Sequence, residues 1–385
     1  MKKNRFFIFL FYAIIFLSID FISTNLIIKK TQVWKNINNN YFFKKHWRIE
    51  SSKYHHDLKK NINVTETWGE AKYKLITNSL GFRDFETRNI KNKNFNKKRI
   101  YINGDSFIEG VGYNYENTSI GLLQNYTANN YEILNSAVTS YSPSIYYTKT
   151  LHYINSGIEF DYALVFLDIS DIPDENFISE DLEGNIFDIR QQNNKTSTKG
   201  KVYLISRFYR DYFTSGKILA VIRERVGSKK SEIKKKFLAS KFYDKSFLKV
   251  SDVEINLYKS LHRDRSMWTY SKKYSDKWEK KGLEKSDKYL SKLFKIFEKK
   301  KVKSYLIIYP NPGQIFYNTK DNHIKYWENW SLKNDVNLIN LYKYFNDMPK
   351  NEAIKNLFIP GDVHWNKEGH LLIFEALKKE LASIL

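Results

Sequence analysis

Five short runs of apolar residues along the chain have the length and composition of buried β-strands. They lie at residues 99–103, 131–138, 160–169, 302–310 and 336–341. The third run, FDYALVFLDI, is almost continuous in apolar side chains, as expected of a strand covered on both faces. Stretches with helical spacing lie between runs at 118–126 and 142–155, and another closes the chain from about Lys367 to Ile384. This alternation predicts an α/β fold with a parallel five-stranded sheet and helices on both sides.

The segment between the third and fourth runs has a different character. Residues 207–226 have helical spacing and mix arginine with aromatic side chains, residues 229–242 are strongly basic, and residues 275–301 again show helical periodicity. We interpret residues 176–300 as a helical, basic insertion that caps one end of the sheet. The arginine and aromatic side chains could lie on anionic lipid or line a groove for an acidic substrate. More commonly, such a helix has one solvated face and one core face.

The N-terminal segment indicates a membrane. After the basic start MKKNR, residues 6–28 are almost entirely apolar, and two lysines follow. A helix of this length is about 30 Å long, which suffices to cross a bilayer. The segment lacks a small-residue cleavage site and is longer than an ordinary signal core, so we favour a retained anchor at residues 1–30 over a cleaved signal peptide. Asp20 and Asn25 count against a span, since an aspartate at mid-helix costs roughly 2.5–3.5 kcal/mol to insert.

The basic start also predicts the orientation of the chain, because positively charged residues stay on the cytoplasmic side. Everything after Lys30 is then expected outside the cytoplasm, in a periplasm or at a cell surface, on a single-pass membrane protein. Residues 31–97 are polar and aromatic without a clear period. We interpret them as a connector that packs on the domain.

Composition narrows the function only a little. The chain has 42% hydrophobic and 16% aromatic residues, enough for a substantial core, and it has no cysteine. Disulfides, cysteine zinc sites and thiol nucleophiles are therefore excluded. The net charge of +22 fits either an anionic partner or simple enrichment in lysine, which accompanies abundant Asn, Ile and Tyr. No pattern of a nucleic-acid-binding module is visible, so we expect no nucleic-acid partner.

Polar residues follow the predicted strands, at the ends where open α/β sheets collect their functional groups. Asp105 and Ser106 follow the first strand, and the segment IPGDVHWNKEGH at 359–370 follows the fifth. A serine hydroxyl becomes a nucleophile when a base takes its proton, and that base works best when a third group fixes its tautomer. Asp362 and His364 point the same way if their segment is extended. The sequence thus predicts a Ser106–His364–Asp362 triad, although a tight turn, a loop histidine and a turn-forming aspartate are the plainer alternatives.

Two motifs in the sequence resemble those of the SGNH (GDSL) hydrolase superfamily. They are the G-D-S after the first strand and the D-x-H-W-N-x-x-G-H near the C-terminus. The segments NSLGFRD, NSAVTSYSP and YPNPGQ are similar to its cell-envelope branch, which is associated with acyl groups on exported polysaccharide and includes alginate-acetylation-like proteins. The resemblance covers about residues 76–173 and 300–380. It implies a flavodoxin-like three-layer fold, with residues 98–175 and 301–385 as its two halves.

The same resemblance implies roles for single residues. Ser106 would be the nucleophile, His364 the general base and then acid, and Asp362 its orienter, although the D-x-H spacing matches the alginate-like relatives better than the commoner D-x-x-H. The oxyanion hole would use the N–H of Ser106 and groups at two positions where this chain departs from the family. Ala137 replaces a glycine and keeps a backbone N–H, whereas Ser170 replaces an asparagine with a shorter donor. Further candidates for contacting substrate, or for replacing that donor, are Asn311, Gln314 and Trp365.

The sequence predicts no cofactor and no metal, because His364 and His370 lack a third ligand and the acidic residues at 168–175 are typical of a turn after a strand. Our first hypothesis is a membrane-anchored O-acetyl esterase or O-acetyltransferase that acts on a cell-envelope polysaccharide or glycolipid. A transferase would also need an acyl-exporting membrane protein as partner. The second hypothesis is a catalytically degenerate domain that binds polysaccharide or scaffolds an envelope complex, as the departures at Ala137 and Ser170 suggest.

Overall fold

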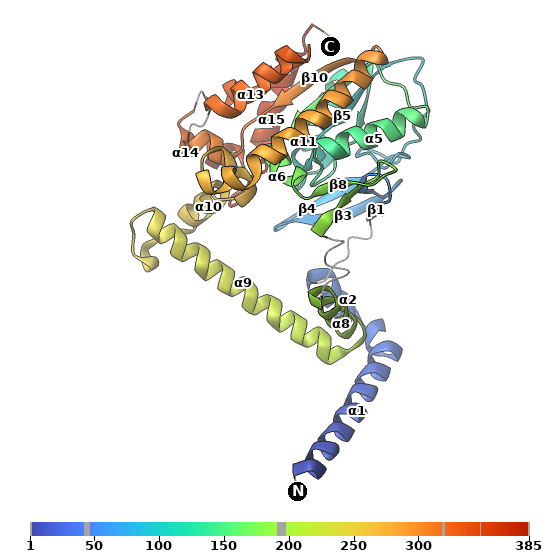
Figure 1. Cartoon of the computed structure of the whole chain (residues 1–385), viewed down its shortest axis with the longest axis vertical. Helices are drawn as coiled ribbons and strands as arrows, with labels where there is room; N and C mark the ends of the chain where they lie inside the picture. The colour runs from blue at the N-terminus through green and yellow to red at the C-terminus, as the bar shows by residue number, and fades with distance from the viewer. Residues whose placement is uncertain (1, 42–46, 191–197, 318–319, 347, 384–385) are drawn as a thin grey trace. The chain divides into compact units, whose positions relative to one another are not determined.

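The computed structural model describes residues 2–41, 47–190, 198–317, 320–346 and 348–383. The chain divides into two compact units. The first comprises residues 1–46 and 189–250, and the second comprises residues 47–188 and 251–385. Figure 1 labels the elements of both units.

A parallel five-stranded sheet forms the centre of the second unit. Its strands are β5 (Lys98–Asn103), β6 (Tyr131–Asn135), β7 (Tyr162–Leu167), β10 (Lys303–Ile308) and β11 (Asn337–Asn340). Their spatial order is β11-β10-β7-β5-β6, and every neighbouring pair is parallel. Counted along the chain, this is the 2-1-3-4-5 order of flavodoxin-like proteins. The predicted parallel sheet of five strands is therefore confirmed.

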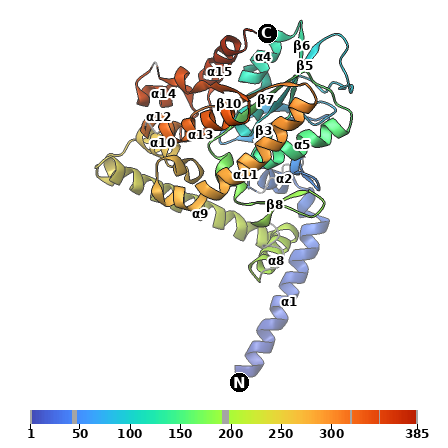
Figure 2. The same cartoon turned by 45° about the horizontal axis from the view of Figure 1, so that its top comes forward.

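Helices cover both faces of this sheet and complete three layers. On one face, α5 (Pro143–Asn155) and α11 (Lys272–Lys299) lie side by side (Figure 1), and the core there also includes side chains of α13 (Lys320–Lys333). On the other face, α4 (Ser119–Thr127) packs against α15 (Lys367–Glu380), which also contacts α14 (Lys350–Leu357) (Figure 2). Residues of β7 alternate between the two cores, as the period of a strand requires: Leu164 and Phe166 face one, Val165 and Leu167 the other.

Helix α11 belongs to one of these layers, although its residues fall within the predicted insertion. Tyr289, Leu293 and Phe297 recur every four residues and are buried in the core with α5. The second unit therefore includes residues 251–300, and also the hairpin of β8 (Ile178–Glu180) and β9 (Ile186–Asp188). Of the segment 176–300 predicted as a cap, only residues 189–250 belong to the other compact unit.

Two hairpins lie in the region predicted to be a connector without a period. β1 (Arg48–Ser51) pairs antiparallel with β2 (His55–Leu58), and β3 (Asn63–Trp68) with β4 (Ala71–Ile76). Gly69, in the second turn, has φ +58°, a left-handed conformation that glycine adopts without steric cost. Tyr73 and Leu75 are buried between exposed lysines. This alternation is the pattern of a half-buried strand, so the expectation of no period was wrong for residues 63–76.

Short elements complete the second unit, with 3-10 helices labelled η. They are α3 (Ser106–Glu109), η2 (Tyr115–Asn117), α6 (Asp171–Glu175), α10 (Asp252–Leu261), η4 (Asp264–Thr269), α12 (Pro312–Tyr317) and η5 (Leu341–Phe345). Helices α3, α6 and α12 follow the carboxyl ends of β5, β7 and β10. They lie at the edge of the sheet where the sequence predicts the functional groups.

The described part of the first unit is helical. It contains α1 (Lys2–Leu26), η1 (Ile28–Lys30), α2 (Gln32–Tyr41), α8 (Thr198–Tyr212), α9 (Thr214–Phe242) and η3 (Phe247–Lys249). Residues Arg5–Lys30 contain an 18-residue stretch with a mean hydropathy of 2.3 and form a segment long and apolar enough to cross a membrane. A retained anchor and a signal sequence both meet that description. The predicted helical character of residues 207–226 is confirmed, apart from a break at Phe213 between α8 and α9.

Candidate active site

Ser106 lies at the carboxyl end of strand β5, between β7 and β6 in the sheet, at the first position of α3. Only glycine fits at position 104, because a Cβ there would lie 2.6 Å from the Ile108 side chain. The Asp105 carboxylate caps α3 by accepting a 3.0 Å hydrogen bond from the N–H of Phe107. This turn fixes the direction of the Ser106 side chain, and the residue is 7% exposed.

Two arginines fix the far end of α3. Arg83 is completely buried and donates to backbone carbonyls that include those of Glu109 and Gly110. Arg48 of β1 donates to the Glu109 carboxylate at 3.0 and 2.5 Å, and the same carboxylate accepts a 2.7 Å hydrogen bond from the N–H of Thr139. Burial alone would raise the pKa of Glu109, but Arg48 and Thr139 lower it to about 2. The nucleophile turn is thus tied to the first hairpin and to the loop after β6.

His364 and Asp362 lie on a turn between α14 and α15. In this turn Asp362 N–H donates to Ile359 O, and Ile359 N–H donates to His364 O, both at 2.9 Å. Nε2 of His364 lies 2.7 Å from Oγ of Ser106, and its Nδ1 lies 2.9 Å from Oδ1 of Asp362. Ser106 and His364 are 258 positions apart in the sequence. The structure thus brings the three residues of the predicted triad into one hydrogen-bonded chain.

The surroundings of Asp362 favour its ionised form. Burial raises its pKa, but the hydrogen bond and charge of His364, the Arg263 guanidinium and the N–H of Val363 together hold the pKa well below its usual value. Trp68 Nε1 also donates to Asp362 Oδ2 at 2.8 Å. An ionised Asp362 accepts the Nδ1–H of His364, which leaves the Nε2 lone pair facing the Ser106 hydroxyl.

Trp68 and Arg263 are two site residues that the sequence interpretation missed. The indole ring of Trp68 meets the His364 ring edge-on at 4.9 Å, so the residue contacts both base and orienter. Arg263 donates to Gly361 O at 3.0 Å and lies 3.7 Å from Asp362 Oδ1. The alternation in residues 63–76 could have placed Trp68 at the end of a hairpin. For Arg263 we find no pattern that distinguishes it from the other arginines.

A cavity of about 400 Å³ opens beside Ser106. Hydroxyl and amide side chains line it from the loops after three strands: Thr139 and Ser140 after β6, Ser170 after β7, and Asn311 after β10. Two guanidinium groups, of Arg263 and Arg265, line it from the start of η4, and Arg265 also donates to Asp174 at 2.8 and 2.5 Å. The carboxylates of Asp105, Asp264 and Asp362 also line the cavity. Its lining is therefore rich in polar groups of both charges, which suits a substrate rich in oxygen atoms and hydroxyl groups.

Two of the three predicted oxyanion donors have partners within the protein. The N–H of Ala137 donates to Asn135 Oδ1 at 3.2 Å, and the N–H of Ser170 donates to Asp168 Oδ2 at 2.8 Å. The Ser170 hydroxyl also donates to Asp168. Each of these groups would have to share or leave its partner to bind an oxyanion, so their role stays a prediction.

The three residues predicted to contact substrate are placed differently. Asn311 lines the cavity; its Nδ2 donates to Ser266 Oγ at 3.1 Å, while its Oδ1 has no partner among the described residues. Gln314 does not line it, because its amide is bound to the backbone and side chains of η4 and to Asn311 N–H. Trp365 does not line it either, since its ring is completely buried against Phe107, at 4.9 Å.

Three buried carboxylates form a cluster that begins beside Ser106. Asp105, Asp168 and Asp171 each present an oxygen within 4.8 Å of the others. Asp168 Oδ1 and Asp171 Oδ1 are buried and have no hydrogen-bond partner among the described residues. Burial raises the pKa of all three, and Asp168 raises that of Asp105 further. Protons or a cation could neutralise the cluster, and the expectation of a metal-free site stays a prediction.

The raised pKa of Asp105 bears on Ser106 directly. Asp105 Oδ2 lies 3.1 Å from Ser106 Oγ, and the serine hydroxyl has a single proton to share between Asp105 and His364. When Asp105 is protonated, it can donate to Ser106 Oγ. The hydroxyl proton then remains available for Nε2 of His364.

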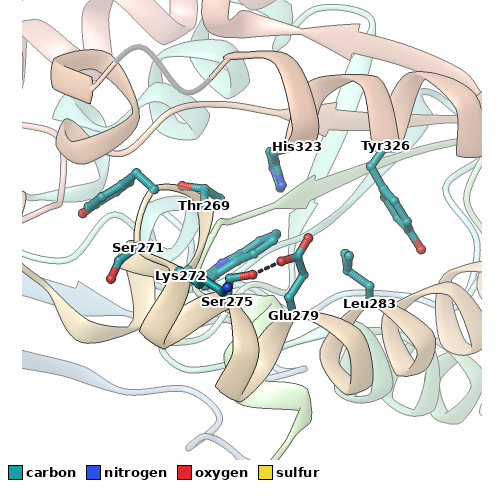
Figure 3. A pocket seen from close by; sticks show the side chains of 10 residues that line it. Thr269, Ser271, Lys272, Ser275, Glu279, Leu283, His323 and Tyr326 are labelled. Atoms are coloured by element: carbon teal, nitrogen blue, oxygen red, sulfur yellow. Dashed lines mark hydrogen bonds between the residues drawn. The ribbon is translucent and has the colours of Figure 1, made fainter.

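A second cavity, of about 250 Å³, lies between α11, α13 and η4 (Figure 3). His323 points into it from α13 toward Glu279 of α11, which accepts a hydrogen bond from Ser275. His323 is 4% exposed, and its ring nitrogens have no hydrogen-bond partner among the described residues. Its burial lowers its pKa to about 3. The described lining of this cavity has no counterpart of the Ser106–His364–Asp362 chain.

The chain matches no family model and no curated protein sequence. It is similar to solved structures. One is the psychrotrophic esterase EstA from Pseudoalteromonas, at 12% identity and a TM-score of 0.38, over 74% of this chain and 98% of that one. Another is an acetylxylan esterase from Geobacillus stearothermophilus, with 11% identity and a TM-score of 0.37. The similarity covers 76% of this chain and 96% of that one. A third is a member of the lipolytic G-D-S-L family from Veillonella parvula, with 10% identity and a TM-score of 0.35. The similarity covers 75% of this chain and 100% of that one. Likenesses this distant carry no argument about activity, so the functional argument rests on the geometry of this chain's own residues.

Proposed function

We propose that this chain is a serine acyl-transfer enzyme of the SGNH (GDSL) type, with Ser106 as nucleophile, His364 as base and Asp362 as its orienter. One observation carries the proposal: the unbroken chain of hydrogen bonds from Ser106 Oγ to His364, at 2.7 Å, and from His364 to Asp362, at 2.9 Å. The cavity beside Ser106 supports it, because a reacting ester needs space next to the nucleophile.

The reaction follows from this arrangement. Ser106 Oγ attacks the carbonyl carbon of an acyl ester while its proton passes to Nε2 of His364, and Asp362 stabilises the imidazolium. The bond from the carbonyl carbon to the leaving oxygen then breaks, and that oxygen takes the proton from His364. An acceptor hydroxyl gives its proton to His364 and attacks the acyl-serine, and Ser106 departs with that proton. Water as acceptor makes the enzyme an esterase, and a sugar hydroxyl makes it a transferase.

The substrate we propose is an O-acetylated glycan of the cell envelope or an exported polysaccharide, with a glycolipid as the related acceptor. The hydroxyl, amide and charged groups that line the cavity beside Ser106 support this class. The apolar segment Arg5–Lys30 supports a single-pass anchor, and its basic start supports a catalytic unit outside the cytoplasm. Working as a transferase, the enzyme would draw its acyl groups from an acyl-exporting membrane protein.

The test is acetyl transfer by the full chain in detergent. We expect release of p-nitrophenol from p-nitrophenyl acetate and an acetyl adduct in the intact mass, both lost in Ser106→Ala. The matched control is Ser156→Ala, which removes an exposed hydroxyl bonded to His152 O at the end of α5 and should leave activity unchanged. Equal inactivity of folded wild type and Ser106→Ala would reject the enzyme. Adding acetylated and free oligosaccharides would then distinguish esterase from transferase.

A catalytically degenerate binding domain is the second candidate. The hydrogen bonds that occupy Ala137 N–H and the Ser170 hydroxyl favour it. A principal oxyanion donor is worth 10²–10³ in rate. Because the Ser170 hydroxyl is already bound to Asp168, we expect Ser170→Ala to lower kcat less than about tenfold. A loss of 10² or more would instead assign Ser170 to the oxyanion hole.

A further inference from the structure

Asp20, in the apolar helix α1, binds the start of α9. Its carboxylate accepts hydrogen bonds from the N–H groups of Thr214, at 3.0 Å, and Ser215, at 3.1 Å, and another from the Ser215 hydroxyl. The Thr24 hydroxyl donates to Asp20 at 3.2 Å and lies 2.7 Å from that of Thr214. The first N–H groups of a helix lack intrahelical partners and carry partial positive charge. Asp20 therefore satisfies two of these groups in α9.

Further contacts extend this attachment along α1. Asn25 Nδ2 donates to the carbonyl of Tyr212, the last residue of α8, at 3.1 Å. The Lys29 ammonium lies 4.0 Å from the centre of the Tyr212 ring. The Phe21 ring lies 5.4 Å from that of Phe213. The turn between α8 and α9 is thus attached to α1 from Asp20 to Asn25, and to Lys29 in η1.

The position of Asp20 sets the depth of this turn in a membrane. Asp20 precedes Lys30, the end of the apolar segment, by ten positions, which is about 15 Å along a helix. An unpaired carboxylate that far inside a bilayer is costly, and membrane proteins retain such groups where a partner compensates them. The N-terminus of α9 is that partner. A membrane-spanning α1 therefore places the turn between α8 and α9 below the outer surface of the bilayer.

The side chains around this turn suit such a place. On α8, four apolar side chains at helical spacing are 41–69% exposed: Val202, Ile205, Phe208 and Tyr212. On α9, the exposed apolar stripe continues with Leu219, Ile222 and Val226. Arg207, Arg210 and Arg223 line a groove of about 580 Å³ formed by α8 and α9. Arg207 and Arg210 share the single carboxylate of Asp211. Exposed apolar stripes beside guanidinium groups match acyl chains beside lipid phosphates.

We propose that α8 and the first turns of α9 form a second membrane element, a helical hairpin that lies in the outer half of the bilayer and is held on α1 by Asp20. Lipid acyl chains cover its apolar stripe, and lipid phosphates pair with its arginines. The proposal rests on the proposed anchoring by α1. It also makes α1 a permanent part of the first unit, because removal of α1 as a signal peptide would strip α9 of its cap.

Site-directed fluorescence in vesicles tests the hairpin. The chain has no cysteine, so single cysteines at Phe208 and Ile222 can each carry an NBD label on the full-length protein. Phe95→Cys, 86% exposed in the second unit, is the matched control. In phosphatidylcholine–phosphatidylglycerol vesicles we expect blue-shifted emission from positions 208 and 222 and quenching by doxyl groups on the acyl chains. Position 95 should be quenched by aqueous iodide instead.

Each of the other possible results of this experiment contradicts a different part of the proposal. If the protein does not float with the vesicles, or if intact mass shows a chain that begins after α1, the anchoring itself is wrong. If the protein floats but labels at 208 and 222 are quenched by iodide, the anchor stands and the hairpin is wrong. If those labels are shielded from both iodide and doxyl lipid, protein and not lipid covers the stripe. Acetyl transfer by the detergent-solubilised chain reports on the proposed enzyme independently of all three.

A pair of leucine substitutions tests the role of Asp20. Asp20→Leu makes α1 more apolar but removes the cap of α9, so we expect flotation to persist and doxyl quenching at position 208 to fall. Ser18→Leu makes a similar change at an exposed position whose hydroxyl bonds only to Ile14 O, and quenching should stay at its original level. Unchanged quenching in Asp20→Leu would show that Asp20 does not hold the hairpin.

Discussion

His364 is held from both sides by groups with different tasks. Its Nδ1 faces an ionised Asp362 and its Nε2 faces Ser106. The rings of Phe107 and Trp68 lie 4.7 and 4.9 Å from the imidazole. Trp68 also donates to the second oxygen of Asp362. The orientation of the base therefore depends on a residue that does not react.

Trp68→Phe tests this dependence. The change keeps a smaller aromatic ring at this position and removes the N–H that donates to Asp362. Hydrogen bonds to charged groups are worth about 1.5–3 kcal/mol, so we expect kcat to fall roughly 10- to 100-fold, with KM nearly unchanged because the bond does not involve the substrate. Steady-state kinetics with p-nitrophenyl acetate gives both constants.

The control for this change is Trp330→Phe, which removes a similar indole donor. Trp330 Nε1 donates to Asp287 Oδ1 at 2.5 Å, on the helical layer away from the triad. Activity should be retained in this variant. A rise in KM with unchanged kcat in Trp68→Phe would show that Trp68 binds substrate and does not position the base.

At the scale of elements, helix α3 depends on contacts with segments remote in the sequence. Glu109 at its end joins Arg48 of β1 to Thr139 in the loop after β6. The pKa of Glu109 is about 2, below its ordinary value, so its charge stabilises the fold above about pH 4.5 and that contribution is lost as the pH falls through 2.

We expect Glu109→Gln to lower the free energy of unfolding by about 3 kcal/mol at pH 7. The reason is that breaking a buried ion pair leaves the partner charge uncompensated. Urea denaturation followed by circular dichroism measures this change. Glu159→Gln is the control, because Glu159 and its partner Lys93 are 61% and 51% exposed and such surface pairs contribute little to stability. Equal losses in both variants would contradict the structural role of Glu109.

The elements differ in how far the sequence determines them. The five sheet strands could be predicted because both of their faces are buried, which makes their apolar runs nearly continuous. Strands β3 and β4 were missed because each buries only one face and exposes lysine and threonine between its buried residues. The contact of Trp68 with Asp362 joins positions 294 apart, and no local pattern encodes it. Helix α11 was assigned to a cap because its periodicity indicates only that one of its faces is buried. The periodicity does not indicate what covers that face.

At the scale of the whole molecule, buried acids influence the pH dependence of folding. The pKa values of Asp105, Asp168, Asp171 and Glu175 are all raised by burial. A carboxyl group with a raised pKa binds a proton in the native state at a pH where the unfolded chain has released it. The free energy of unfolding then falls as pH rises from about 4 through the raised values.

Asp171→Asn should relieve part of this effect. An Asn oxygen can still accept from the Tyr146 hydroxyl and the Asp168 N–H, which both bind Asp171 Oδ2, while the negative charge is removed. Because the raised pKa of Asp171 destabilises the fold where its carboxylate is ionised, we expect a gain in stability at pH 8 and a flatter profile from pH 4 to 8. Thermal unfolding at several pH values measures it. The exposed Asp276→Asn should leave the profile as in wild type, and a loss of stability in Asp171→Asn at pH 8 would instead indicate a bound cation.

The wide separation of Ser106 from His364 in the sequence has a consequence for biosynthesis. During synthesis, the turn that carries Ser106 leaves the ribosome long before His364. The apolar segment Arg5–Lys30 emerges before both residues, and residues 189–250 of the first unit emerge between them. A nascent or truncated chain that stops before residue 362 has a serine on a strand end but nothing to remove its proton. If the chain is the proposed enzyme, acyl esters at the site of synthesis are protected until nearly the whole polypeptide has been made and the last strand and helix have docked.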